Sequence, residues 1–547
     1  MLFIGILSNA ENNLIINTQN REITSLNGQW HYIIDQYENG FYNYRLKPFD
    51  QERNYENNHG AYFTDYIQQD KRELIEYNFE TAPTIKVPGS WNAQVEQLFW
   101  YEGTVWYRKR FDYKKKEASN RVFVYFGAVN YEAHVYLNGH KLGVHVGGFT
   151  PFNFEITEWL KDGENSLVVK VDNKRHKDAV PTVNTDWFNY GGLTRDVKLI
   201  ETPATFIQDY KIQLKKGSMT DVAGYVQLNG TQAGQDVTVA IPELKILTTI
   251  KTDAQDKAAI DFKLKKAEYW SPENPKLYDV TLTAGPSVVN DQIGFRSIET
   301  KGSDILLNGK KVFLRGISIH EENGNKGDRA CSQEDAQLIL NRAKALNCNF
   351  VRLAHYPHNE YMIKTAERMG IIVWSEIPVY WTISWENEET FKNASQQLQD
   401  MINRDKNRAN VIIWSVANET PVSDARTKFL TKLIAKVKEM DDARFVSAAL
   451  EKHTLSNEPL QVSIEDPFAQ YVDVLSFNQY LGWYDGLPEK CNRAQWTIKF
   501  DKPVIISEFG GGALYGFHAD KETRWSEEFQ EDLYIQNLKT TKTRGTH

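Results

Sequence analysis

The sequence is poor in cysteine and lacks the common signatures of redox, nucleotide and zinc chemistry. Its three thiols, Cys331, Cys348 and Cys491, are scattered, with no CxxC pair and no disulfide spacing. GxGxxG, P-loop and HExxH motifs are absent, so nucleotide-binding and zinc-protease classes have no support. No apolar run approaches the roughly 20 residues of a membrane span. The sequence therefore predicts no cofactor and no membrane partner.

Basic clusters are lacking as well. The chain has 72 Asp and Glu against 64 Lys and Arg, a net charge of −8, which argues against nucleic acid as a partner. Hydrophobic residues make up 41% and charged residues 25%, the balance of a globular protein. Aromatic residues reach 12%, as is frequent in proteins that stack sugar rings and in large β-domains. A length of 547 residues predicts three or four domains.

The start of the chain has a short apolar stretch, Leu2 to Leu7, but no basic residue before it. Ser8-Asn9-Ala10 follows, with small residues of the kind that precede a signal-peptidase site. We interpret residues 1–10 as the remnant of an export signal, which predicts a periplasmic or secreted protein. The alternative is a frayed N-terminus on a cytoplasmic protein.

The first 300 residues have the period of β-structure. Val122, Val124 and Phe126 alternate along one strand, and a second strand ends at the turn Asn138-Gly139. We predict a jelly-roll β-sandwich over residues 11–203. Shorter, evenly spaced strands follow, which predict an immunoglobulin-like β-sandwich over residues 204–298.

The pattern changes again in residues 299–547, where apolar strands alternate with amphipathic helices. Val312–Gly316 is the first expected strand, and Ser332 opens the first helix with Glu334 and Asp335 in its first turn. Such βαβ units predict a parallel (β/α)8 TIM barrel as the catalytic domain. Only seven strands can be counted, so we expect the last strand and helix to be missing. The other six expected strands are Asn349–Leu353, Ile371–Trp374, Val411–Trp414, Phe445–Ala448, Val472–Phe477 and Val504–Ile506.

Two glutamates follow buried-strand runs of this predicted barrel. Glu419 comes after Val411–Trp414 and Glu508 after Val504–Ile506, so both are expected at the carboxyl ends of strands, where barrel enzymes carry their chemistry. Paired carboxylates are what glycoside hydrolysis requires. A single glutamate is more often a solvated loop residue. Two at matching positions favour catalysis.

The residues around these glutamates resemble glycoside hydrolase family 2, which includes β-galactosidases, β-glucuronidases and β-mannosidases. Asn418-Glu419 after one strand and Ser507-Glu508-Phe509-Gly510 after another match its catalytic motifs. Several further segments match the sandwich domains of the family: 87–92 (VPGSWN), 135–139 (VYLNG), 147–152 (GGFTPF), 189–195 (NYGGLTR) and 270–275 (WSPENP).

The resemblance implies a retaining exo-β-glycosidase that removes terminal β-linked sugars from oligosaccharides or glycoconjugates by double displacement. Glu508 would be the nucleophile and Glu419 the acid/base, with their carboxyl groups about 5–5.5 Å apart. Asn418 would bind the sugar's 2-hydroxyl. His320 and His355 would contact other sugar hydroxyls, although a lone histidine is more often structural.

The remaining implied site residues support the nucleophile or the sugar. Arg352 would orient the nucleophile and keep it ionised, and Tyr480 would donate a hydrogen bond to it. Asp186 would reach the site from the first sandwich. Trp483 would stack on the sugar ring, and the same is conceivable for Trp374 and Trp381; for all three a place in the core is the alternative.

A metal is not expected, because some family members use a Glu-x-His pair after the third strand and Ser375-Glu376-Ile377-Pro378 has no such histidine. Tyr484 resembles the tyrosine by which β-glucuronidases recognise the sugar carboxylate. The family's more specific Asn-x-Lys motif belongs after the eighth strand, beyond the last residue of this chain. We therefore predict a β-glucuronidase-like enzyme.

Two alternatives stay open at this point. The first is a β-galactosidase of the same family. The second, of another class, is a non-catalytic carbohydrate-binding protein or an inactive truncated homologue. The expected partner in every case is a carbohydrate, and self-association into a homo-oligomer is a further expectation.

Overall fold

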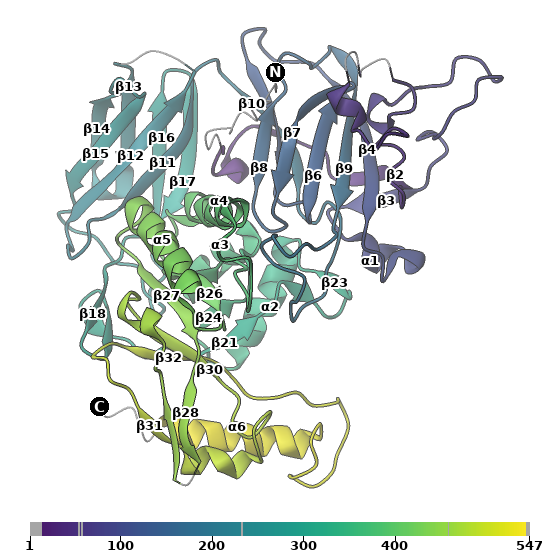
Figure 1. Ribbon diagram of the computed structural model, residues 1–547. Coiled ribbons are helices and arrows are strands. Elements are labelled where there is room, and N and C mark those ends of the chain that lie inside the picture. The colour runs from purple at the N-terminus through teal and green to yellow at the C-terminus, as the bar shows by residue number, and fades with distance from the viewer. Residues whose placement is uncertain (1–13, 53–54, 56–57, 231–233, 458, 543–547) are drawn as a thin grey trace.

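The computed structural model describes residues 14–542, apart from 53–54, 56–57, 231–233 and 458. Two β-sandwiches lie side by side above a third, mixed domain in Figure 1, with the C-terminal helix α6 (Glu527–Lys542) at the far end. The predicted multidomain architecture of jelly roll, immunoglobulin-like sandwich and parallel barrel is confirmed. The predicted export-signal remnant lies outside the described residues.

The first sandwich consists of a six-stranded and a four-stranded antiparallel sheet. Val122, Val124 and Phe126 point into the core between the two sheets. Phe123 and Tyr125 point outward from the same strand and pack into the core of the second sandwich. This is why the strand is apolar on both faces. The sheets are ordered β3 (Thr84–Val87), β2 (Gly28–Ile34), β4 (Thr104–Tyr113), β9 (Gly163–Asp172), β6 (Glu132–Leu137), β7 (His140–Val146), and β1 (Ile23–Ser25), β10 (Val197–Thr202), β5 (Arg121–Phe126), β8 (Phe152–Glu155).

The second sandwich has seven strands in sheets of three and four. Its last strand alternates strictly between buried and exposed residues, as expected when one face meets the core and the other meets water. The sheets are ordered β11 (Phe206–Leu214), β12 (Asp221–Asn229), β15 (Lys257–Lys263), and β14 (Ile246–Lys251), β13 (Asp236–Ile241), β16 (Tyr278–Ala284), β17 (Ser287–Ile293).

The first barrel strand differs from the prediction. It is β21 (Gly316–Ile319), whereas Val312–Gly316 was expected. Val312 and Leu314 instead pack against an apolar cluster at the amino ends of the barrel strands, which contains Trp270 and Ile413. Their apolar character therefore comes from closing the bottom of the barrel, beside the small sheet of β18 (Ile298–Lys301), β19 (Asp304–Leu307) and β20 (Lys310–Lys311).

Seven parallel strands form the barrel in sequence order. Ser332 caps the first helix with a reciprocal capping box to Asp335, as the prediction of a helix start at that residue requires. The strands are β21, β24 (Phe350–Leu353), β25 (Ile372–Glu376), β26 (Val411–Asn418), β27 (Phe445–Leu450), β30 (Leu475–Gln479) and β32 (Val504–Phe509), and the helices before α6 are α2 (Gln333–Ala345), α3 (Glu360–Arg368), α4 (Glu388–Asp405) and α5 (Asp424–Met440).

The barrel is nearly closed. Its first and last strands, β21 and β32, face each other, and the Ser318 hydroxyl donates to the Ser507 carbonyl over 3.0 Å. Within the described residues the two strands share no ladder of backbone hydrogen bonds. Val504 at the start of β32 stays 39% exposed, so this seam is only partly covered.

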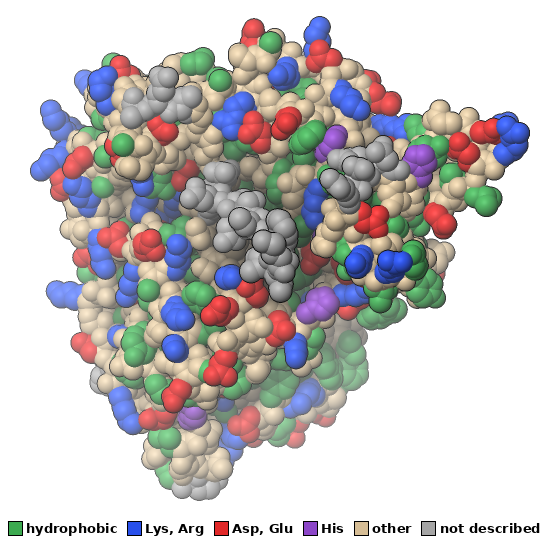
Figure 2. Space-filling view, turned by 45° about the horizontal axis from the view of Figure 1, so that its top comes forward, with side chains coloured by type: hydrophobic (Ala, Val, Ile, Leu, Met, Phe, Trp, Pro, Cys, Tyr) green, Lys and Arg blue, Asp and Glu red, His purple; other side chains and the backbone are tan. Residues whose placement is uncertain are grey.

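The face shown in Figure 2 mixes acidic and basic side chains without a large area of one sign. The absence of a nucleic-acid partner stays a prediction. In the part of the chain that the structure describes, no helix has the length and apolar content to cross a membrane.

Candidate active site

The two predicted glutamates lie at the carboxyl ends of barrel strands. Glu419 directly follows the fully buried strand β26, and its amide donates to the Ala449 carbonyl on the next strand. Its φ of 46° is left-handed, so the chain turns sharply where the strand ends. Glu508 lies near the end of β32. A pair of carboxylates at one end of a parallel barrel is the arrangement that the sequence predicted.

Glu508 is surrounded by donors. Tyr480 donates its hydroxyl to Oε2 over 2.6 Å, Arg352 donates Nη1–H to Oε1, and His355 Nε2 lies 3.5 Å from Oε1. Burial alone would raise the pKa of Glu508, but the charge of Arg352, with His355 and Tyr480, outweighs it and holds that pKa below its ordinary value. The carboxylate is therefore ionised at neutral pH, as a nucleophile must be.

A second buried carboxylate, Glu376 on β25, holds Arg352 from behind. It accepts from Arg352 Nε at 3.1 Å and Nη2 at 2.9 Å, and from the Trp374 indole at 2.8 Å. Its Oε1 also lies 2.8 Å from His355 Nδ1. Burial would raise the pKa of Glu376, and Arg352 and His355 lower it to about 2. Sequence reasoning considered Glu376 only as a metal ligand; the structure shows that it anchors the arginine.

Asn418 is oriented by the same arginine. Its Oδ1 accepts from Arg352 Nη2 at 2.7 Å and from Asn478 Nδ2 at 3.2 Å. Asn478 is in turn fixed by the Ser507 hydroxyl at 2.8 Å. The Asn418 Nδ2 group is buried and has no partner among the described residues. A donor is thus left free for a ligand, with its direction set by the occupied oxygen.

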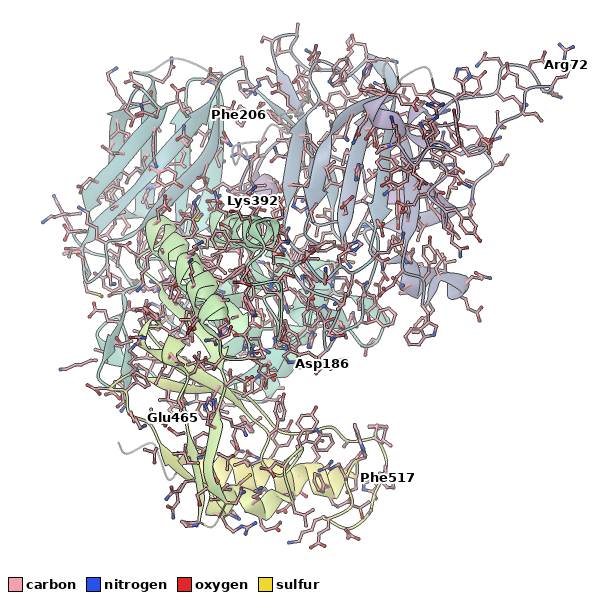
Figure 3. All side chains as sticks on the ribbon, in the orientation of Figure 1. Arg72, Asp186, Phe206, Lys392, Glu465 and Phe517 are labelled. Atoms are coloured by element: carbon pink, nitrogen blue, oxygen red, sulfur yellow. The ribbon has the colours of Figure 1, made fainter. Side chains whose placement is uncertain are left out.

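The first sandwich reaches the site through Asp186 and Trp187. Figure 3 shows Asp186 where the lower end of that sandwich meets the barrel. Its charge and those of Glu419 and Glu508 all act on the hydroxyl of Tyr380 and help to raise its pKa, after burial as the main cause. The structure therefore brings Asp186 to the predicted site.

Trp187 forms an aromatic wall that the sequence reasoning missed. Its ring centre lies 5.7 Å from that of His355, 5.1 Å from that of Tyr380 and 6.2 Å from that of His320. Burial in this wall lowers the pKa of His320 to about 3, so its imidazole is neutral at physiological pH. The position of Trp187 directly after Asp186 was the available signal.

Two further predicted residues, Tyr484 and Trp483, differ in their exposure. Tyr484 is 72% exposed, and its ring stands edge-on 5.1 Å from that of Tyr480, at the open side of the site. Trp483 is buried with Phe529 and Leu533 in a small apolar cluster. The structure thus gives Trp483 a packing role, and its stacking on a sugar stays a prediction.

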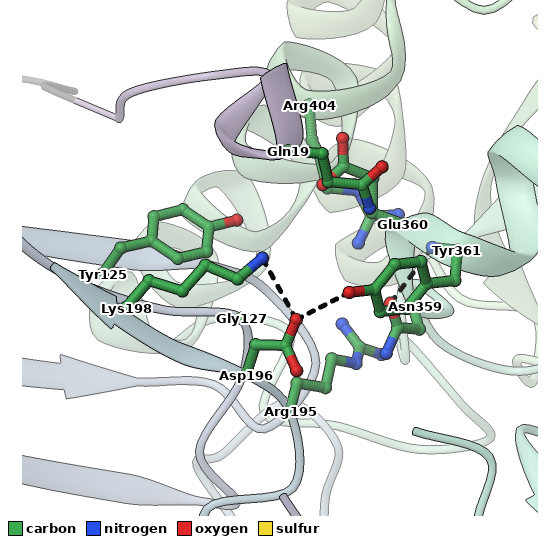
Figure 4. A pocket seen from close by; sticks show the side chains of 10 residues that line it. All are labelled: Gln19, Tyr125, Gly127, Arg195, Asp196, Lys198, Asn359, Glu360, Tyr361 and Arg404. Carbon is green, nitrogen blue, oxygen red and sulfur yellow. Dashed lines mark hydrogen bonds and ion pairs between the residues drawn. The ribbon is translucent and has the colours of Figure 1, made fainter. Parts of the chain in front are cut away.

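A separate cavity lies between the first sandwich and the barrel (Figure 4). None of the residues around the two glutamates lines it. In it Asp196 accepts from Lys198 over 3.1 Å and from the Tyr361 hydroxyl over 2.9 Å. Beside it Arg195 donates to buried Glu321 over 3.0 Å, which ties the sandwich to the residue after His320. The charged groups of this cavity pair with one another, and the cavity lies where the first sandwich meets the barrel.

Candidate metal ligands do not cluster in the structure: the described residues contain no group of three or more His, Cys, Asp or Glu side chains that could hold an ion. The carboxylate after the third strand, Glu376, is already paired with a guanidinium. The expectation that the enzyme works without a metal stays a prediction.

Comparison with known proteins agrees with this geometry. The chain matches "Glycosyl hydrolases family 2, sugar binding domain" over residues 23–203, "Glycosyl hydrolases family 2" over 197–296 and "Glycosyl hydrolases family 2, TIM barrel domain" over 298–543. Together these matches span nearly the whole chain and confirm the family predicted from the motifs.

Individual relatives point the same way. A Paenibacillus borealis β-glucuronidase is 29% identical over 83% of this chain and 82% of its own length. A Formosa agariphila protein, provisionally named a β-glucuronidase, is 29% identical over 87% of this chain, but the match spans only 59% of that longer relative. The solved structure of the Bifidobacterium dentium β-glucuronidase complexed with coumarin-3-O-glucuronide superposes with a TM-score of 0.80 at 25% identity, covering 96% of this chain and 89% of that one. The chain therefore belongs to glycoside hydrolase family 2 and is a glycoside hydrolase similar to β-glucuronidases.

Proposed function

We propose that this protein is a retaining exo-β-glucuronidase, with Glu508 as nucleophile and Glu419 as acid/base. The observation that carries the proposal is the environment of Glu508, an ionised carboxylate at the end of β32 gripped by Arg352 and Tyr480. Both hydrogen bonds fix the direction of its oxygens without removing its charge. The relatives named above support the glucuronide as substrate.

In the first step, a Glu508 oxygen would attack the anomeric carbon while Glu419 passes its proton to the glycosidic oxygen, so that the leaving group departs as an alcohol. Positive charge develops on the sugar ring in this transition state. The free Nδ2–H of Asn418 would donate to the 2-hydroxyl, a contact that strengthens as the charge develops. The product is a glycosyl ester on Glu508.

In the second step, Glu419 would take a proton from water, and the water oxygen would attack the anomeric carbon and release Glu508. Tyr480 is a donor before attack and after release, because burial and the nearby charge of ionised Glu508 raise its pKa well above the ordinary value. Two inversions at one carbon give net retention of configuration.

The glycone is assigned from the relatives and from Tyr484. The ring of this exposed tyrosine lies 5.1 Å from that of Tyr480, which itself bonds Glu508, and Tyr484 would bind a carboxylate on the sugar. The relatives named above do not favour the β-galactosidase alternative, and membership of a hydrolase family does not favour a non-catalytic binding protein.

The test is an inactivation experiment with 2-deoxy-2-fluoroglucuronosyl fluoride, followed by peptide mass mapping. We expect one label, on Glu508, and none in Glu508→Gln. A label on another residue with Glu508 unmodified would refute the nucleophile. Faster turnover of a 4-nitrophenyl galactoside than of the matching glucuronide would refute the glycone.

The acid/base assignment has its own test. Glu419→Ala should retain more activity on an activated aryl glycoside than on an alkyl glycoside, because only the latter needs the proton. Added azide should accelerate the variant by replacing water in the second step. Equal losses on both substrates without an azide effect would contradict the role of Glu419.

We also propose a periplasmic or secreted location from the apolar stretch Leu2 to Leu7. Cell fractionation tests it, and activity confined to the cytoplasm would contradict it. Self-association into a homo-oligomer likewise stays a prediction, for which light scattering of the purified protein is the measurement.

A further inference from the structure

Glu419 has a side-chain partner that the chemistry above does not use. The indole Nε1–H of Trp381 donates to Glu419 Oε2 over 3.2 Å. Among the described residues, Trp381 provides the one hydrogen bond to the Glu419 carboxylate. Trp381 lies in the segment after β25, so the partner comes from a strand next to the one that carries Glu419.

The backbone holds these two residues in register. Trp381 N donates to the Asn418 carbonyl over 3.0 Å, and Asn418 N donates to the Val379 carbonyl over 2.9 Å. Trp381 and Glu419 both have left-handed φ angles, 50° and 46°, at the points where their segments turn. Two side chains that leave a shared ladder at matching turns have little freedom to drift apart. The main-chain contacts therefore hold Trp381 and Glu419 side by side, so that the indole reaches the acid/base.

Trp381 is also accessible, with 37% of the residue exposed. Its neighbour Tyr380 packs against it, with ring centres 4.6 Å apart, and turns inward to His355. Trp381 is thus the outer member of the aromatic wall. Since the acid/base must stand beside the glycosidic oxygen, an exposed ring bonded to it stands beside the group that leaves.

We propose that Trp381 is a positioning residue for the acid/base and forms one wall of the leaving-group subsite. Its N–H occupies Glu419 Oε2, which leaves Oε1 as the oxygen that hands the proton to the glycosidic oxygen. The exposed ring offers a flat apolar face to a planar aglycone or to a sugar ring. This inference rests on the proposed role of Glu419.

The first experiment compares Trp381→Phe with Trp100→Phe, a matched change at a tryptophan that is 81% exposed on the first sandwich. The substrates are an alkyl and a 4-nitrophenyl glycoside of whichever sugar the wild-type protein cleaves. We expect Trp381→Phe to lower kcat/KM on the alkyl glycoside at least about tenfold and to leave kcat/KM on the activated substrate near its wild-type value, because kcat/KM reports the first step and only the alkyl leaving group needs proton donation there.

Trp100→Phe should leave the kinetics on both substrates unchanged, and both variants should have the melting temperature of the wild type. Equal losses of kcat/KM on both substrates in Trp381→Phe, or no loss on either, would overturn the positioning role. A wild-type protein that cleaves a galactoside and not a glucuronide would refute the proposed glycone alone, since the same comparison then runs with the galactoside.

A second measurement does not depend on turnover. In protein labelled with 15N-tryptophan, the Trp381 indole N–H resonance is identified by its loss in Trp381→Phe. It should move in Glu419→Ala and keep its place in Glu439→Ala, a change at an exposed residue of α5. An indole resonance that is unmoved in Glu419→Ala would show that the hydrogen bond is absent and would overturn the proposal.

Discussion

Replacing Glu376 by glutamine tests the claim that this residue anchors the site. The buried carboxylate accepts three hydrogen bonds, two from Arg352 and one from Trp374, and also lies against His355. Glutamine has nearly the same shape but no charge, and its amide nitrogen cannot accept. At least one donor is left without an acceptor, and Arg352 keeps Glu508 as its one carboxylate partner in this cluster.

The size of the loss follows from the pKa of Glu376, which its partners lower from 4.5 to about 2. A pKa lowered by about 2.5 corresponds to about 3–3.5 kcal/mol of unfolding free energy, at roughly 1.4 kcal/mol for each step of one in pKa. This agrees with the roughly 3–5 kcal/mol for breaking a buried ion pair. Because the folded pKa is depressed, the contribution is present above the unfolded value and is lost as pH falls toward about 2.

The assay is urea unfolding at pH 7 of wild type, Glu376→Gln and the control Glu389→Gln, which changes an exposed glutamate of α4. We expect Glu376→Gln to lose about 3 kcal/mol and the control almost nothing. The gap between wild type and Glu376→Gln should narrow as pH falls below the ordinary glutamate pKa. A loss no larger than that of the control, or a gap that is constant with pH, would refute the reasoning.

Two further predictions concern hydrogen bonding and pH. Tyr480→Phe removes the donor to Glu508 and should lower kcat/KM roughly tenfold to a hundredfold, the effect of a hydrogen bond to a charged group, with an unchanged melting temperature; kinetics at the wild-type level would contradict it. Burial raises the pKa of Asp400 to about 7, against the hydrogen bonds from Gln396 and Thr150. The folded chain therefore holds a proton that the unfolded chain loses from about pH 4, so unfolding free energy falls between about pH 4 and 7. Asp400→Asn should flatten that fall, as pH-dependent urea unfolding can measure, and an equally steep fall in the variant would count against a buried, protonated Asp400.

The domain order could be predicted because each domain has its own period. Alternating residues such as Val122 and Val124 mark a sandwich strand, and continuous runs such as Val411–Trp414 mark strands covered on both faces. The first barrel strand was placed too early because Val312 and Leu314 are apolar for another reason, the closing of the barrel bottom. Hydropathy predicts that a residue is buried, but it does not say which element packs against that residue.

The site was predictable as far as its motifs extend. Glu419 and Glu508 follow strand runs that any parallel barrel would direct to one end. The anchoring role of Glu376 was not predictable, since a buried carboxylate can hold a metal or an arginine and only its neighbours decide. Trp187 was missed because it reaches the site from another domain, where the one available signal was its position directly after Asp186.

The contact between Arg195 and Glu321 limits how freely the parts of this enzyme can be exchanged. Glu321 is held by Arg195 of the first sandwich and by Arg329 of the barrel, and it is 1% exposed. A barrel expressed alone would lose the first of these cations and bring a buried acid to a bare surface, directly after His320. Recombining sandwich and barrel between family members should therefore succeed only where both halves keep this pair. Because of this junction the barrel depends on the sandwich, and domain-exchange experiments should transfer the two domains together.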